Sequence, residues 1–82
     1  MLSCENYDYI EIACMHRFAI KLTLKSGDIV VGTALDTLHN DNKQECVKVL
    51  VEKTEQSVVL DEVVKLEAVT ANPHFQQISF LD

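Results

Sequence analysis

Hydrophobic and polar residues follow two different periods along this chain, and the change falls near residue 17. Between residues 4 and 16, Glu5, Asp8 and Glu11 recur every three residues, so a helix would place them along one stripe. Apolar positions recur at intervals of three and four and would form a second stripe of Tyr7, Ile10, Ala13 and Cys14. The spacing predicts an amphipathic helix over residues 4–16, with one stripe for packing and an acidic stripe facing outward.

Residues 9–12 within this segment also alternate as a strand would, and their β-branched and aromatic side chains lower helix propensity. Two features favour the helix. Ser3 or Asn6 can cap its first turn, and acidic residues follow at the positive end of the helix dipole.

From residue 18 the pattern alternates with a period of two, which is typical of half-buried strands. Gly27 supplies a turn, and Gly32 interrupts the second apolar segment, where a glycine often marks a bend or bulge. The pattern predicts strands over residues 18–25, 29–35, 45–52, 57–60 and 63–69, and a short tail strand over 78–81.

The most polar segment is residues 36–44, which has an Asn-Asp-Asn centre and is predicted to be an exposed loop. Asp41 and Asn42 lie at its tip and make it a second candidate contact surface. A short break at Asp61 and Glu62 separates the fourth predicted strand from the fifth.

One helix followed by short antiparallel strands, with a bent second strand and a break before the fifth, is the element order of an Sm-like small barrel. Barrel closure removes exposed strand edges. We predict a mainly β fold with one N-terminal α-helix, an Sm-like antiparallel barrel of five to six strands. Periodicity alone equally allows an SH3-like barrel. At 82 residues the chain has room for one compact core, so we expect a single domain over 1–82.

The charge of the chain indicates which kind of partner it can bind. Thirteen acidic residues against seven basic ones give a formal charge of −6, and the basic residues are spread singly. Binding to phosphates requires several converging Lys or Arg side chains, so nucleic acid is not expected as a direct ligand. An acidic surface favours a basic protein partner.

Other function classes find little support in the sequence. None of the three cysteines has another cysteine two to four residues away, so we predict no metal site. No local signature of a nucleophile with its base is present, and we predict neither an enzyme nor a cofactor. With an odd cysteine count, no signal peptide pattern and only short apolar runs, we expect a cytoplasmic protein that does not enter a membrane.

The predicted helix resembles the opening signature of a known family. The matching residues are Cys4, Tyr7, Asp8, Ile10, Glu11, Ile12, Ala13, Cys14 and His16. They are similar to the run Cys-x-x-Tyr-Asp-x-Leu-Glu-Leu-Ala-Cys-x-His of the small Rho-binding antiterminators, the Rof family, also called YaeO. A weaker, collinear likeness continues through the Lys-x-Gly turn at residues 25–27 and a connection that carries Asp36.

The resemblance implies an Sm-like fold and a protein that inhibits the hexameric helicase Rho, the transcription termination factor. It places Tyr7, Asp8 and Glu11 at the contact with Rho. The full set of residues that we predict to bind Rho is Glu5, Tyr7, Asp8, Glu11, Asp41 and Asn42. We expect their acidic surface to occupy the primary RNA-binding site of Rho and block RNA loading, giving antitermination, and the free protein to be a monomer.

A ring-forming, Sm-like RNA-binding chaperone is the alternative that the same barrel supports. Ring-forming RNA binders need a basic or amide-lined pore, whereas acids here outnumber bases almost two to one. A hexamer that binds RNA unaided would favour this alternative.

Overall fold

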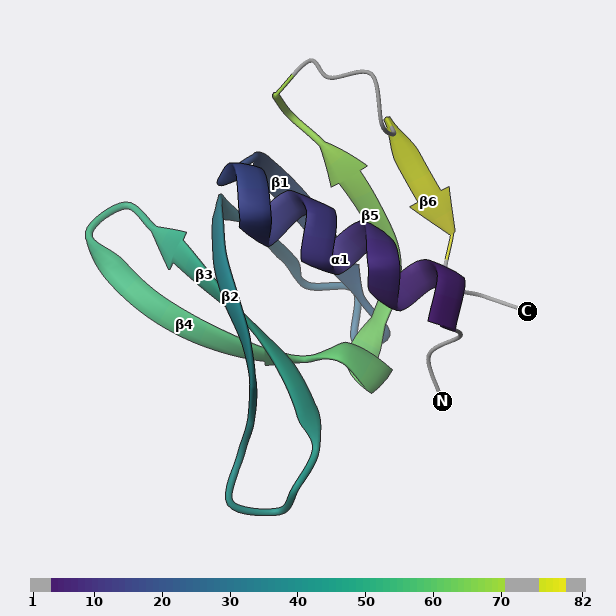
Figure 1. The fold of residues 1–82 in the computed structure, drawn as a ribbon, viewed down its shortest axis with the longest axis vertical. Helices are drawn as coiled ribbons and strands as arrows, with labels where there is room; N and C mark the ends of the chain where they lie inside the picture. The colour runs from purple at the N-terminus through teal and green to yellow at the C-terminus, as the bar shows by residue number, and fades with distance from the viewer. Residues whose placement is uncertain (1–3, 71–75, 80–82) are drawn as a thin grey trace.

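The computed structural model describes the backbone of residues 4–70 and 76–79, and the side chains of that part from Tyr7 onward. One helix is followed by six strands and one short 3-10 helix (Figure 1). The elements are α1 (Cys4–His16), β1 (Ala19–Leu24), β2 (Ile29–His39), β3 (Glu45–Val51), β4 (Thr54–Val59), η1 (Leu60–Glu62), β5 (Val63–Ala68) and β6 (Gln77–Ser79).

The strands form one antiparallel sheet in the order β4-β3-β2-β1-β5-β6. Figure 1 shows the long β2–β3 and β3–β4 hairpins curving away from the helix, which lies across the sheet. The predicted fold class was mainly β with one N-terminal helix and an Sm-like antiparallel barrel of five to six strands. It is confirmed as one helix followed by a six-stranded antiparallel sheet. The predicted break before the fifth strand is η1, a single turn at residues 60–62.

The core lies between α1 and the inner face of the sheet. From the helix, Ile10 and Ala13 are 0 % exposed and Cys14 is 8 % exposed, and Tyr7 packs half-buried against the same cluster. The strands contribute alternate positions, among which Ile20, Leu22 and Leu66 are fully buried. The apolar stripe predicted from the spacing in α1 is therefore the stripe that packs, chiefly against β2.

A Schellman motif ends the helix at His16. The Phe18 N–H donates to the Ala13 carbonyl at 3.0 Å, and the Arg17 N–H donates to the Cys14 carbonyl at 3.3 Å. Arg17 has a φ of 54°, in the left-handed region where glycine is the usual residue. The motif reverses the chain within one residue, so that Phe18 is buried directly beneath the helix end.

The second strand is longer than predicted. β2 continues through His39, because Asp36, Thr37, Leu38 and His39 all pair with β3. The prediction of a loop over residues 36–44 is therefore wrong for its first half, and the connection is confined to residues 40–44. Polar side chains on a paired strand removed the alternation on which the prediction depended.

The fourth strand also differs, since β4 begins at Thr54 and the turn before it is reduced to Glu52 and Lys53. Residues 54–57 are exposed on both faces, so no apolar alternation marks them as strand. At the other end of the sheet β6 spans Gln77–Ser79, and the rest of the predicted tail strand, residues 80–81, lies outside the described residues.

Two adjacent features give β2 its shape. Gly32 allows close approach of β3, because a Cβ built there would lie 2.7 Å from Val49 Cγ1 and closer still to the Leu50 carbonyl oxygen. The register shift follows further along: Ala34 pairs with Val49 and Asp36 with Lys48, which leaves one extra residue on β2. The irregularity predicted at Gly32 thus lies two to four residues beyond it.

We predict that Gly32→Ala destabilises the protein by about 2 kcal/mol or more, because the added methyl group meets backbone and cannot be accommodated by a rotamer change. Urea unfolding followed by circular dichroism measures the effect. Ser57→Ala, at an exposed position of β4, should stay within about 0.5 kcal/mol of the wild type. Equal unfolding midpoints for the two variants would contradict the close approach of β3.

Candidate functional site

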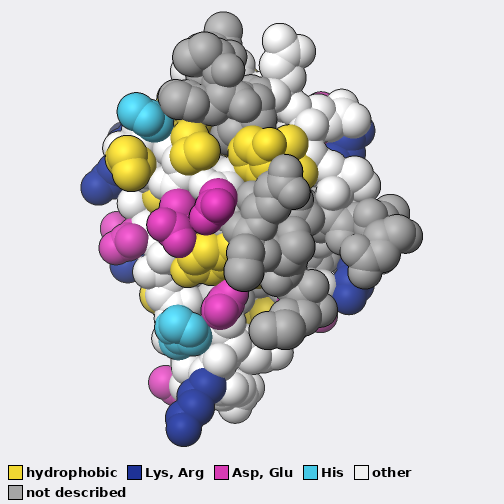
Figure 2. Space-filling model, turned by 45° about the vertical axis from the view of Figure 1, so that its right-hand side comes forward, with side chains coloured by type: hydrophobic (Ala, Val, Ile, Leu, Met, Phe, Trp, Pro, Cys, Tyr) yellow, Lys and Arg dark blue, Asp and Glu magenta, His cyan; other side chains and the backbone are white. Residues whose placement is uncertain are grey.

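The outer side of α1 is acidic. Asp8 and Glu11 are exposed, one helical turn apart, while Ile10 between them is fully buried. Figure 2 shows a group of Asp and Glu side chains on the side of the molecule where α1 lies, with Lys and Arg side chains toward the edge of the view. Tyr7 is half-buried and so presents part of its surface beside the stripe. The side chain of Glu5 lies outside the described side chains.

The β2–β3 loop is organised by Asn40, a residue that the sequence prediction did not single out. Its Oδ1 accepts hydrogen bonds from the N–H groups of Asn42 at 2.9 Å and Gln44 at 3.0 Å, and its Nδ2 donates to Gln44 Oε1 at 3.0 Å. Lys43 takes a φ of 62° and closes the turn. Asp41 and Asn42 are exposed at the tip of this fixed loop. The Asx-turn chemistry of asparagine is the signal that points to Asn40.

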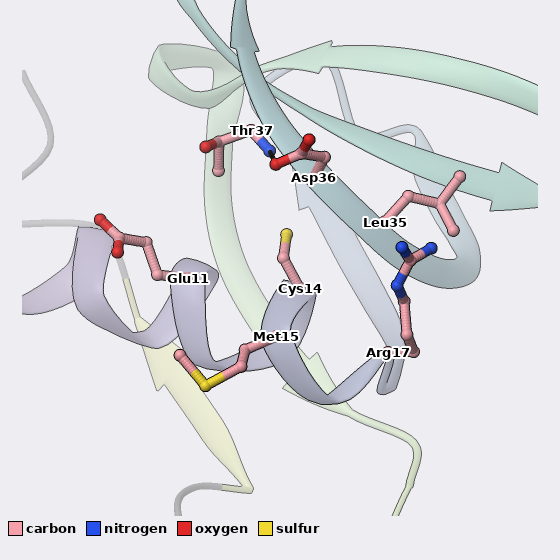
Figure 3. A pocket seen from close by; sticks show the side chains of 7 residues that line it. All are labelled: Glu11, Cys14, Met15, Arg17, Leu35, Asp36 and Thr37. Carbon is pink, nitrogen blue, oxygen red and sulfur yellow. Dashed lines mark hydrogen bonds between the residues drawn. The ribbon is translucent and has the colours of Figure 1, made fainter.

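An open pocket of about 490 Å³ lies between the last turns of α1 and the middle of β2 (Figure 3). It is lined by Glu11, Cys14, Met15, Arg17, Leu35, Asp36 and Thr37. In Figure 3 the Cys14 thiol points toward Asp36, and Arg17 extends toward Leu35 on the opposite side from Glu11. The pocket therefore has an acidic end and a basic end, with a thiol on its floor.

The extra residue in β2 determines where Asp36 points. In a regular strand Asp36 would share the face of Ala34, which is 0 % exposed. The register shift between these two residues brings the Asp36 side chain to the surface instead. Its Oδ1 accepts a hydrogen bond of 2.8 Å from the Thr37 N–H, which orients the carboxylate at the rim of the pocket.

The carboxylates of Glu11 and Asp36 belong to no ion pair of the described residues. Ion pairs of that part include Lys21–Glu67 at 3.9 Å, Lys65–Glu67 at 3.6 Å and Lys48–Glu55 at 3.6 Å, and these three lie within the sheet. The acidic end of the pocket is thus available to a cation from outside.

The surroundings of Cys14 raise the pKa of its thiol. Burial is the largest cause that raises its pKa, Asp36 is the next, and Glu11 adds to them, whereas Arg17 lowers it. Together they raise the pKa of Cys14 from 9.0 to about 11. The thiol is therefore protonated near neutral pH and is a poor nucleophile.

The structure places the predicted contact residues in two regions. Asp8 and Glu11 share the outer side of α1, and Glu11 also lines the pocket together with Asp36. Asp41 and Asn42 project from the far end of the β2–β3 hairpin, about 15 Å beyond Asp36 along an extended strand (Figure 1). Asp36 and Arg17 were not predicted as site residues, because their proximity to Glu11 depends on how α1 docks on β2.

The described part of the chain shows neither of two other kinds of site. No group of three or more His, Cys, Asp or Glu side chains there is arranged to hold a metal ion. No helix of that part is both long enough and apolar enough to cross a lipid bilayer.

The chain thus has a small, curved antiparallel sheet with one N-terminal helix lying across it (Figure 1). The family model of the ROF proteins, described as modulators of Rho-dependent transcription termination, matches residues 1–80. The chain therefore belongs to the ROF family, and the resemblance seen in the helix is confirmed.

A solved structure supports the same assignment. The structure of YaeO bound to magnesium, from Vibrio cholerae O395, is 41% identical in sequence and superposes with a TM-score of 0.87. The match covers 92% of this chain and 97% of that one. The comparison with curated proteins gives no match.

We predict that Cys14 reacts slowly with iodoacetamide. At pH 8 a pKa of about 11 instead of 9.0 leaves roughly 100-fold less thiolate, and the rate should rise about tenfold per pH unit up to that pKa. Mass spectrometry of the Cys14 peptide measures the rate, with protein in denaturant as the reference. Asp36→Asn removes one of the causes that raise the pKa and should accelerate the reaction. Equal rates in folded and unfolded protein would contradict the environment described.

Proposed function

We propose that this protein inhibits Rho by binding its primary RNA-binding site with the acidic side of α1, so that RNA is not loaded and termination is suppressed. One observation carries the proposal. Asp8 and Glu11 are both exposed on a helix whose opposite stripe is buried, in a chain that belongs to a family of modulators of Rho-dependent termination.

The acidic side of α1 and an RNA-binding site carry complementary charges. Sites that hold single-stranded RNA combine cationic side chains, which track the phosphates, with aromatic side chains on which bases stack. Carboxylates in a row along one helix offer such a site negative charges at fixed spacing. The net charge of −6 adds long-range attraction and speeds the encounter at low salt.

Tyr7 is suited to be the anchor of this contact. Its side chain packs half-buried against the core, and it directly precedes Asp8 in α1. A ring that is already held loses little conformational freedom on binding, and tyrosine is frequent among residues that dominate interface energies. Glu5 precedes Asp8 by three residues on the same helix and would extend the acidic stripe.

The β2–β3 loop is the second contact in this proposal. Asp41 and Asn42 stand at its tip, and the hydrogen bonds to Asn40 hold the loop in one shape before binding. A preformed loop avoids part of the entropy loss that a flexible one would bring to the complex.

The free protein would be a monomer that binds no nucleic acid itself. β6 pairs with β5 and covers that side of the sheet, which leaves β4 as the outer strand on the other side among the described strands. The basic residues of β1, β3 and β5 are engaged by Glu67 and Glu55, so no basic patch forms there for phosphates.

We predict that Asp8→Lys or Glu11→Lys weakens binding to Rho by tenfold or more, because each turns an attractive charge into a repulsive one at a basic surface. Fluorescence anisotropy with labelled protein measures affinity, and displacement of a labelled cytidine-rich RNA from Rho measures competition. Glu52→Lys, the same charge reversal at the exposed β3–β4 turn, is the matched control. All three variants should unfold near the wild-type midpoint, since exposed substitutions shift stability by about 0.5 kcal/mol or less.

Two results would count against the proposal. Undiminished RNA binding by Rho at saturating protein would show that the RNA site is not blocked. Wild-type affinity in both helix variants would place the contact elsewhere on the molecule.

We predict a smaller effect at the loop. Asp41→Lys should weaken Rho binding by roughly threefold to tenfold, because a contact at the rim of an interface is partly hydrated. Asn40→Ala leaves the net charge unchanged and should weaken binding through loss of the loop shape, visible as a slower association rate. The same anisotropy titration and stopped-flow mixing measure both. Unchanged affinity and rates in both variants would remove the loop from the interface.

A further inference from the structure

The pocket between α1 and β2 places two carboxylates and a thiol around one space. Glu11 comes from the helix and Asp36 from the irregular part of β2, and both are exposed. The Cys14 side chain is 8 % exposed and points into the pocket (Figure 3). Two carboxylates that line one pocket, neither of them paired with a cation of the described residues, indicate a space that suits a positively charged group.

The lining favours a guanidinium group as the occupant. A planar guanidinium can donate to two carboxylates at once, whereas an ammonium acts as a point charge. It is also more weakly hydrated, so it enters a pocket whose walls include Leu35 and Cys14 with a smaller desolvation penalty. A volume of about 490 Å³ accommodates one long side chain with several water molecules.

The arrangement of charge gives the occupant one orientation. Arg17 extends along the opposite side of the pocket from Glu11, so a cation is repelled from that side and attracted to the space between Glu11 and Asp36. The raised pKa of Cys14 reports the same balance, because Asp36 and Glu11 raise it and only Arg17 lowers it.

We propose that this pocket receives an arginine side chain of the protein partner, held between the carboxylates of Glu11 and Asp36 above the Cys14 thiol. The inference rests on the proposed function and adds Asp36 and one type of partner residue to it. Cys14 is a lining residue here and takes no chemical part.

The first test compares Asp36→Asn with Asp28→Asn. Both remove one negative charge without changing side-chain shape, and both positions belong to the β2 region, about 25 Å apart along an extended strand. Asp36→Asn should weaken Rho binding at least tenfold, while Asp28→Asn should bind as the wild type does. Equal affinities for the two variants, with the wild type binding Rho, would overturn the pocket proposal and leave the proposed function standing.

The second test needs no Rho. Blocked arginine (N-acetyl-arginine amide) is titrated at millimolar concentration into ¹⁵N-labelled protein, with blocked lysine as the comparison. Arginine should shift the amide signals of Cys14, Leu35 and Thr37 in the wild type and in Asp28→Asn, and leave them in place in Asp36→Asn. These shifts would support the pocket even if Rho did not bind, in which case only the proposed function fails.

Three outcomes, two from this titration and one from sedimentation, would overturn the assignment. Shifts of equal size with blocked lysine would remove the preference for a guanidinium. Absence of shifts at the pocket would show that no cation is held there. A dimer of the free wild-type protein in sedimentation, dissolved by Asp36→Asn, would make the occupant a side chain of a second copy of this chain.

Discussion

The packing of α1 against β2 and the inner face of the sheet is the interaction on which the rest of the structure depends. A helix of thirteen residues is marginal by itself in water, so its stability comes from burial of Ile10, Ala13 and Cys14. A fully buried large aliphatic side chain contributes about 1.5–3 kcal/mol. Once this stripe is buried the rotation of the helix is fixed, and Asp8 and Glu11 can only face outward.

Where α1 packs against the irregular part of β2, the two elements form an acidic recess. The close approach at Gly32 holds β2 against β3, and the extra residue that follows reverses the direction of every later side chain. Asp36 is thereby taken from the buried face and brought to the rim of the pocket, opposite Glu11. A helix stripe and a strand irregularity, each local, together define an acidic recess that neither has alone.

The elements that were predicted correctly are those in which burial imposes a period on the sequence. The stripe of α1 and the alternation of β1 reflect one buried face each. The bounds of α1, β1, β3 and β5 agree within one or two residues, although in β5 the buried residues are Val63 and Leu66 and do not alternate. The first half of β4 and the end of β2 are held by ladder hydrogen bonds while their side chains remain exposed. Backbone pairing leaves no trace in the pattern of side chains, so these parts could not be predicted from it.

Some residues of the candidate site could be predicted from the sequence and others could not. Asp8 and Glu11 were found from the sequence because exposure on an amphipathic helix follows from spacing alone. Asp36 and Arg17 could be found only from the packing of α1 on β2. They line the same pocket as Glu11 because of the register shift in β2 and the Schellman turn at Arg17. A row of carboxylates attracts any basic surface, whereas a pocket with an acidic end and a basic end accepts a cation in one place and orientation. On the proposed function, selectivity among basic partners would depend on the part of the surface that tertiary packing builds, and general attraction on the part that the helix sequence specifies.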